Sequence, residues 1–295
     1  MVLEDLLTDV GQRRRQTHQR LGGRDGAVTE HRGDGKTKFT YLFAKDARES
    51  YSTTTGWTGA RAYNRKARFR VLNAAGTGTF TSAGQFAAAN TGSDSSAAMF
   101  SPGRILQFGG NSNGAVVIDI NGATPSVTVT SAMASQRRLA TATILPNGRV
   151  LATGGSPVWN DITNASYQAE IWNPQNGQWT VGATHARARL YHSVGLLLPD
   201  ATVLVAGGGA PGPQNNTNGE IYYPPYLFNA DATAAERPAI DSAPTVVDPG
   251  RTVQLSVTST RPVARVTFVA TGSVTHGWNM NQRFVELPFS GSGGE

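Results

Sequence analysis

The chain has 295 residues, among them 34 glycines, 15 prolines and no cysteine, and its formal net charge is +6. This length is sufficient for one large domain or two smaller ones with apolar cores. No apolar run approaches the twenty residues that cross a bilayer, which excludes a membrane-spanning helix. The lack of cysteine excludes disulfides and thiol chemistry and leaves the compartment open.

Residues 1–70 hold the positive charge, with 15 Lys and Arg against eight Asp and Glu, while the rest has 11 against 12. The basic run Gln12-Arg-Arg-Arg-Gln16 comes without an aromatic or groove-binding motif, which favours a solvated tail over nucleic-acid binding. We expect a basic, poorly ordered extension over residues 1–70 and no nucleic-acid partner. This segment also lacks the pattern of a secretory signal, so the sequence leaves the localisation undetermined.

Residues 71–236 contain a repeat in which a short apolar strand ends at paired glycines. The first glycine of each pair is Gly109, Gly154 or Gly207, so the pairs recur after 45 and 53 residues. This spacing, with many Val, Ile and Thr, predicts an all-β chain and an incomplete kelch-type β-propeller of three to four blades. Trp172 and Trp179 are expected to pack between neighbouring sheets.

Residues 237–295 have a different pattern, in which polar and apolar residues alternate over 253–257 and 263–269. Period two predicts half-buried strands. We therefore expect a second, truncated β-domain over 237–295.

Three residues suggest metal binding: Tyr191 and His192 lie side by side, and His276 follows far downstream. Both histidines stand in apolar, strand-like surroundings, where each ring nitrogen needs a partner. Imidazole and phenol are suitable copper ligands, whereas hydrogen bonding within a turn is the alternative.

These residues occur in segments that resemble the galactose oxidase and glyoxal oxidase family of copper radical oxidases. The segments are Arg189-Leu-Tyr-His-Ser193 with Leu196-Leu-Leu-Pro-Asp200, Thr275-His276 with Asn281-Gln-Arg283, Met99-Phe-Ser-Pro-Gly103, and 136–149. The resemblance implies Tyr191 as axial copper ligand and base, His192 and His276 as equatorial ligands, and one copper ion. It also implies an immunoglobulin-like early-set domain over 237–295, a small alcohol, aldehyde or carbohydrate ligand, and a secreted protein.

Two positions depart from the resemblance. The family pattern expects a cysteine where this chain has Ser101 and a tyrosine where it has Leu139, and those two residues form the linked Tyr-Cys radical cofactor. A chain without sulfur at this position cannot form the thioether. The sequence therefore predicts a homologue that binds copper only or is inactive, and the alternative is a non-catalytic kelch module that binds a protein or glycan near Tyr222, Tyr223 and Tyr226.

The number of predicted strands is lower than a closed propeller and a complete sandwich need. An open arc leaves blade edges and apolar faces uncovered. We expect a fragment of a longer ancestral protein that self-associates through exposed blade edges.

Overall fold

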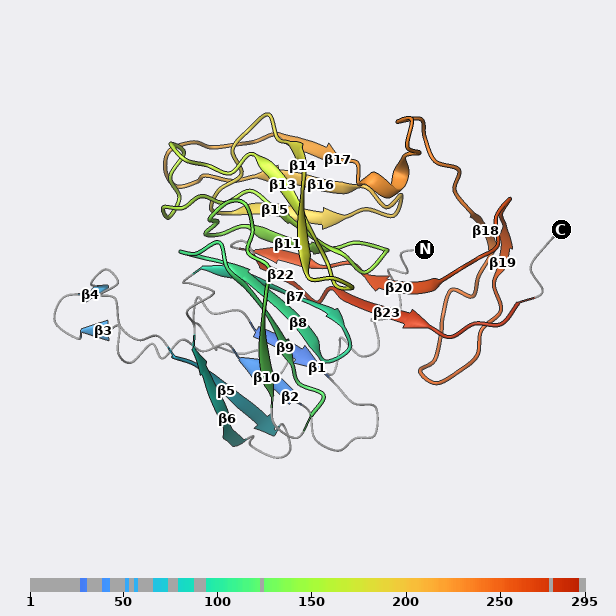
Figure 1. Cartoon of the computed structure of the whole chain (residues 1–295), viewed down its shortest axis with the longest axis horizontal. Helices are drawn as coiled ribbons and strands as arrows, with labels where there is room; N and C mark the ends of the chain where they lie inside the picture. The colour runs from blue at the N-terminus through green and yellow to red at the C-terminus, as the bar shows by residue number, and fades with distance from the viewer. Residues whose placement is uncertain are drawn as a thin grey trace.

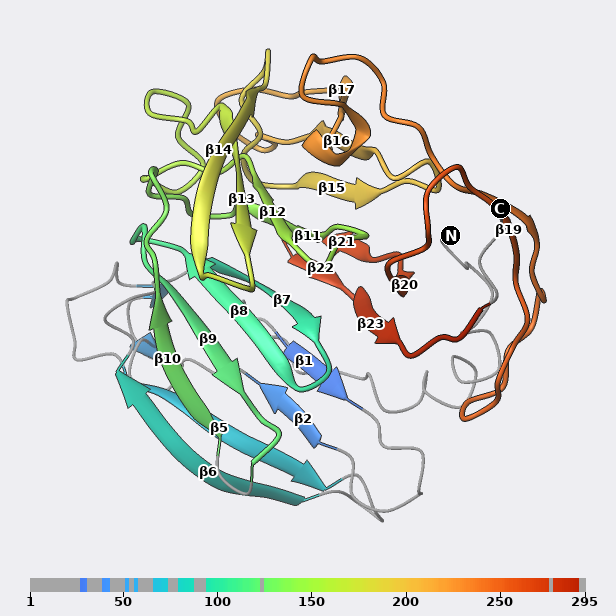
Figure 2. The same ribbon diagram turned by 45° about the vertical axis from the view of Figure 1, so that its right-hand side comes forward.

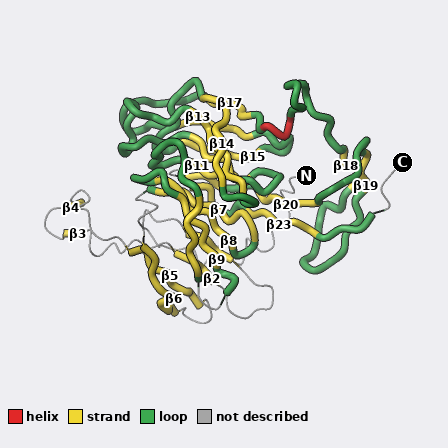
Figure 3. Tube along the Cα trace, viewed as in Figure 1, coloured by secondary structure: helices red, strands yellow, loops and turns green. Residues whose placement is uncertain are grey.

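The computed structural model describes residues 27–30, 39–42, 51–52, 56–57, 66–73, 79–87, 94–122, 125–275 and 278–291. The described chain is all-β, as predicted, with one short 3-10 helix, η3 (Pro225–Leu227), in these ranges (Figure 3). Nowhere in these ranges does a helix have the length and apolar content of a membrane span.

Three successive antiparallel sheets form the body of the molecule, and each starts at its innermost strand (Figures 1 and 2). The first contains β7 (Ser95–Ser101), β8 (Arg104–Gly109), β9 (Ala115–Asp119) and β10 (Ser126–Thr130). The second contains β11 (Thr141–Ile144), β12 (Val150–Thr153), β13 (Gln168–Asn173) and β14 (Gln178–Thr184). The third contains β15 (Ser193–Leu197), β16 (Val203–Gly207) and β17 (Gly219–Tyr222). The inner strand β11 contacts both β7 and β15, so the sheets follow one another around these strands.

The paired glycines set how closely successive sheets approach. Gly109 and Gly154 have left-handed backbones, with φ of 77° and 66°. A Cβ at Gly109 would lie 2.5 Å from the carbonyl oxygen of Arg137, and one at Gly154 would lie 2.3 Å from that of Arg189. Only glycine fits there, because any side chain would collide with the loop that enters the next sheet.

Aromatic rings fill the space between the first and second sheets. Trp172 is 1% exposed and meets the Phe100 ring edge-on at 4.8 Å, and Trp179 meets Phe108 at 5.2 Å. Such pairs contribute about 0.5–1.5 kcal/mol each beyond the area they bury. The prediction that both indoles pack between sheets is confirmed.

The C-terminal region has shorter strands than its periodicity indicated. They are β18 (Ala239–Ser242), β19 (Ser256–Thr258), β20 (Val266–Ala270), β21 (Ser273–Thr275), β22 (Trp278–Met280) and β23 (Arg283–Leu287). β18 pairs with β19, β20 with β23, and β21 with β22. The expectation of half-buried strands is confirmed for β20, within 263–269, and is wrong for 253–257, where only β19 forms a strand and all its residues are exposed.

Before residue 94 the structure describes strands only, by their backbone course. They are β1 (Ala27–Glu30), β2 (Phe39–Leu42), β3 (Tyr51–Ser52), β4 (Gly56–Trp57), β5 (Lys66–Asn73) and β6 (Thr79–Ala87). Four of them form a sheet in the order β1-β2-β5-β6. Most of residues 1–70 lie outside the described ranges, so the poorly ordered extension stays a prediction.

Candidate metal centre

A residue with a left-handed backbone precedes each inner strand. These residues are Asp94 before β7, Leu139 before β11 and His192 before β15, with φ of 62°, 60° and 66°. Leu139 N donates to Asp94 O at 2.9 Å, and Thr143 Oγ1 donates to Gly195 O at 3.2 Å, so the inner strands run side by side in register. The three residues therefore lie at the same end of the three sheets.

Tyr191 and His192 form the part of this end with metal-ligand chemistry. Their rings stack with centroids 3.8 Å apart, and the Trp159 ring lies 5.1 Å from the Tyr191 ring. His192 Nδ1 lies 2.8 Å from the carbonyl oxygen of Ala210, which can only accept a hydrogen bond. Nδ1 therefore carries a proton, and Nε2 is the ring nitrogen that can serve as a metal ligand.

His276 lies outside the described residues, but the strands that flank it have a clear course. Asn279, on β22, donates from Nδ2 to Gly195 O at 3.0 Å in the middle of β15. Gln282 donates to Ala142 O and accepts from Ile144 N, and the Phe284 ring packs on Gly148, in the turn beyond β11. Going back along the chain from β23 to β22 therefore leads toward the end of the sheets at which β11 and β15 begin (Figure 2).

The prediction that Ser101 occupies the position of the family's cysteine, next to Leu139, is wrong. Ser101 pairs with Arg104 at the opposite end of β7, about 20 Å away at ~3.3 Å per residue. The residue beside Leu139 is Asp94, whose carboxylate accepts from Arg138 Nε at 3.0 Å and Nη2 at 2.8 Å.

The spacing in the sequence identifies Asp94 as the residue equivalent to Leu139 and His192, although the Met99–Gly103 motif pointed to Ser101 instead. Asp94, Leu139 and His192 each stand 15 positions before the first glycine of their pair, Gly109, Gly154 or Gly207. Ser101 stands only eight positions before Gly109. Distance to the glycine pair therefore identifies equivalent positions better than the Met99–Gly103 motif does.

Two ion pairs, one buried and one partly exposed, hold the loops that lead to these positions. Arg137 contacts Glu170 at 2.8 Å, and Arg189 contacts Glu220 at 2.6 Å. Burial lowers the pKa of Arg137, and Glu170 partly offsets this effect. His185 is buried beside the second pair, and burial lowers its pKa. Both pairs satisfy the loop backbone, because Glu170 also accepts from Ala134 N and Glu220 from Ala186 N.

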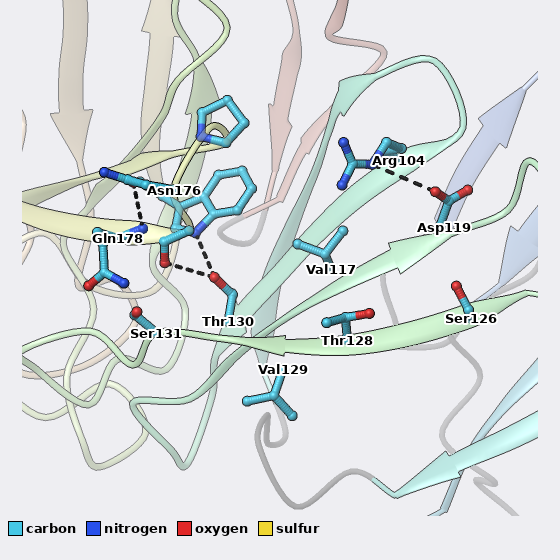
Figure 4. Close-up of a pocket in the computed structure, with 13 residues that line it drawn as sticks. Arg104, Val117, Asp119, Ser126, Thr128, Val129, Thr130, Ser131, Asn176 and Gln178 are labelled. Carbon is cyan, nitrogen blue, oxygen red and sulfur yellow. Dashed lines mark hydrogen bonds and ion pairs between the residues drawn. The ribbon is translucent and has the colours of Figure 1, made fainter.

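An open groove of about 430 Å³ lies away from this end, between β10 and the turn that joins β13 to β14 (Figure 4). Hydroxyl and amide side chains line it, together with the Arg104 and Asp119 pair at 3.7 Å. Neither Tyr191 nor His192 lines this groove.

The predicted aromatic surface is smaller than the sequence indicated. Tyr222 is 7% exposed, and Tyr226 is half-buried and donates to Ala201 O at 2.6 Å. Burial raises the pKa of both phenols. Of the three tyrosines only Tyr223 is well exposed, at 58%, with Phe228 near it.

The comparison with known proteins agrees with this architecture. A family model described as the galactose oxidase-like early set domain matches residues 237–295. A galactose oxidase of Gibberella zeae is 30% identical over 209 residues, which are 65% of this chain and 30% of that protein. These matches support the galactose oxidase and glyoxal oxidase family for this chain. An aldehyde oxidase of Arabidopsis thaliana is 29% identical over 195 residues, which are 58% of this chain and 31% of that family member.

A solved structure extends the comparison to the fold. A fungal alcohol oxidase in complex with copper superposes with a TM-score of 0.71 at 23% identity, over 87% of this chain and 62% of that one. The chain thus has a galactose oxidase-type fold, and its matches span about a third of the length of the curated relatives in the family.

Proposed function

We propose that this chain binds one copper ion through Tyr191, His192 and His276. The observation that carries the proposal is the stacking of the Tyr191 and His192 rings, together with the hydrogen bond from His192 Nδ1 to Ala210 O, and Nε2 is the ring nitrogen that we assign to the metal. Imidazole nitrogen and phenolate oxygen suit Cu(II), and the relatives include an alcohol oxidase in complex with copper. Bound copper supplies a one-electron redox couple.

The course of β22 supports His276 as the third ligand. In the described part of the chain no three His, Cys, Asp or Glu side chains gather as a metal-binding group. A complete site therefore needs a residue from outside these ranges. The strands that flank His276 lie along the inner strands, with β21 against β15.

The residues present do not fit the Tyr-Cys radical cofactor. The chain has no cysteine, Leu139 has no ring or oxygen, and Asp94 beside it is engaged by Arg138. We therefore propose that the chain does not turn over alcohols or aldehydes as its relatives' names describe. Tyr191 would hold the metal and accept a proton at its phenol oxygen, and a small alcohol, aldehyde or carbohydrate would bind beside it.

The same proposal includes the architecture and the domains. We interpret the three sheets as blades of an incomplete kelch-type β-propeller over 71–236, followed by a truncated early-set domain over 237–295. The chain would then be a fragment of an ancestral protein that associates through its uncovered sheet. The alternative of a non-catalytic module that binds a protein or glycan is less well supported, because Tyr222 and Tyr226 are turned inward.

Copper titration tests the proposal. The parent is expected to bind one Cu(II) with nitrogen couplings in its electron spin resonance spectrum, and His192→Gly and His276→Ala each to weaken binding at least tenfold. Glycine is chosen because it accepts the left-handed backbone at residue 192.

His31→Ala is the matched control, since it removes a histidine that the proposal does not assign to copper. Unchanged copper binding in the double variant His192→Gly/His276→Ala would refute the site. Peroxide formed at ordinary turnover rates from galactose or glyoxal would refute the loss of oxidase activity.

A further inference from the structure

Asn160 is a buried polar residue in the surface loop between β12 and β13. It is only 7% exposed, although Trp159 before it is 39% exposed. Its φ of 49° is left-handed, a conformation that asparagine adopts more readily than most residues. A buried amide in a loop needs partners for its oxygen and its nitrogen, and those partners indicate its role.

The Asn160 side chain joins two segments that meet at the candidate metal centre. Its Oδ1 accepts from the backbone N of Tyr191 at 3.3 Å. Its Nδ2 donates to the carbonyl oxygens of Gly209 at 3.2 Å and Pro211 at 3.1 Å. These three bonds fix the orientation of the amide. Its oxygen must face the Tyr191 N–H, and its nitrogen must face the two carbonyl oxygens.

The two carbonyl bonds lie on either side of Ala210, whose oxygen accepts from His192 Nδ1. The segment is also tied to the ligand pair directly, since Gly209 N donates to Tyr191 O at 2.6 Å. A Cβ at Gly212 would lie 2.6 Å from Asn160 Nδ2, so the segment closes tightly around this amide. Asn160 thereby fixes the peptide that holds the His192 ring.

We infer that Asn160 is a positioning residue, which sets the tautomer and ring orientation of His192 and holds Tyr191 next to it. The inference rests on the proposed function for its link to copper, while its effect on His192 is measurable without metal. A carbonyl that accepts from the far nitrogen of an imidazole fixes the ring for its metal. Loss of such an indirect contact typically weakens metal binding about 10–100-fold.

Two variants separate positioning from loop stability. Asn160→Gly keeps the left-handed backbone and removes all three bonds. Asn160→Asp keeps an acceptor for Tyr191 N and loses both donors, so it acts on the Ala210 side alone. If Asn160 acts through Ala210, both variants release His192; if it only anchors Tyr191, the aspartate variant behaves as the parent does.

The matched control is Asn113→Ala. Asn113 follows the first glycine pair, as Asn160 follows the second, and donates from Nδ2 to Met133 O at 3.0 Å. Its bond anchors a loop in the same way, but it contacts neither Tyr191 nor the 209–211 segment. Its loss therefore measures the effect of a looser loop by itself.

The experiment reads the His192 tautomer in metal-free protein by ¹⁵N NMR at one pH at which the ring is neutral, and then copper affinity and spin-resonance parameters. The parent and Asn113→Ala are expected to show the Nδ1-protonated form. Asn160→Gly and Asn160→Asp are expected to show a mixture of tautomers, altered copper spectra and about 10–100-fold weaker binding. Thermal unfolding identifies a variant that fails to fold, in which case the other decides.

A parent-like tautomer in both variants would overturn the inference, and so would a parent-like tautomer in Asn160→Asp alone. A parent that binds no copper, with tautomers that shift in the variants as expected, would refute the proposed function and support the role of Asn160. The two failures are therefore distinguishable.

Discussion

The second and third sheets are built alike, yet one face is covered in the second sheet and half-open in the third. In the second sheet Thr141, Thr143 and Thr153 are each 1% exposed, because β15 of the third sheet packs on them. In the third sheet the corresponding face consists of Val194, Leu196, Leu204, Ala206, Gly219 and Ile221. Ile221 is 42% exposed. Half-buried residues of this face are Val194, Leu196, Leu204 and Ala206. The strands of the two sheets are paired in the same way, so the difference in exposure comes from the neighbouring sheet, which covers this face in the second sheet.

The loops that enter the two sheets share a frame and differ at single positions. Arg137 with Glu170 and Arg189 with Glu220 hold the two loops in the same way. Leu139 in one loop corresponds to His192 in the other, and Met133 corresponds to His185. Each ion pair thus holds its loop in the same conformation, so the residue type at neighbouring positions of the loop can differ between the two sheets.

The largest expected effect comes from removing Glu170. Glu170→Ala leaves the Arg137 charge buried and the N–H groups of Ala134 and Ser135 without their acceptor. We expect a loss of about 3–5 kcal/mol in the free energy of unfolding. Glu220→Ala is expected to cost less, about 1.5–3 kcal/mol, since the Glu220 side chain is 27% exposed and water reaches it.

Urea unfolding of both variants, with the midpoints compared at equal m, measures this difference. Equal losses would show that the exposure of the carboxylate does not decide the strength of the pair.

The next effect is pH-dependent and concerns His185. Burial lowers its pKa below the usual 6.5, so the unfolded chain takes up a proton before the folded one as the pH falls. The neutral histidine therefore gives its full contribution above about pH 6.5, and that contribution is lost toward acid pH.

His185→Met copies the residue at the equivalent position of the preceding loop, Met133, which is 2% exposed. We expect its stability to fall less than that of the parent between pH 7.5 and pH 5. Parallel stability curves for the two proteins would show that His185 is not buried in its neutral form.

The smallest expected effect concerns the open face of the third sheet. Val194→Thr with Leu196→Thr copies Thr141 and Thr143 of the second sheet, and the half-buried positions should change stability by about 1 kcal/mol or less. If the proposed self-association uses this face, sedimentation velocity will show a larger monomer fraction in the double variant. An unchanged distribution would place the association elsewhere.

Much of this arrangement was predictable from the sequence, because local chemistry determines it. The glycine pairs predicted the strand ends, since a left-handed φ and a close backbone contact require glycine. Trp172 was predicted as core from its size and its place in the repeat. The adjacent Tyr191 and His192 were predicted as metal ligands, and the structure stacks their rings on each other.

The errors came from long-range geometry. Ser101 was matched by a short motif, but a strand of seven residues carries it to the far end of β7 from Leu139. Asn160 gave no signal, because its partners lie about 30 and 50 positions further along the chain. The tyrosines at 222 and 226 were expected on the surface, and their rings turn inward instead.

The sequence by itself determined the all-β class, the repeat and the absence of cysteine, since these follow from residue types and their spacing. Only the tertiary structure decided which sheet face is covered, which residue stands beside Leu139, and which loop holds the His192 ring. The physical reason is that spacing along a strand fixes how side chains alternate, whereas contact depends on how separate strands and loops pack against each other.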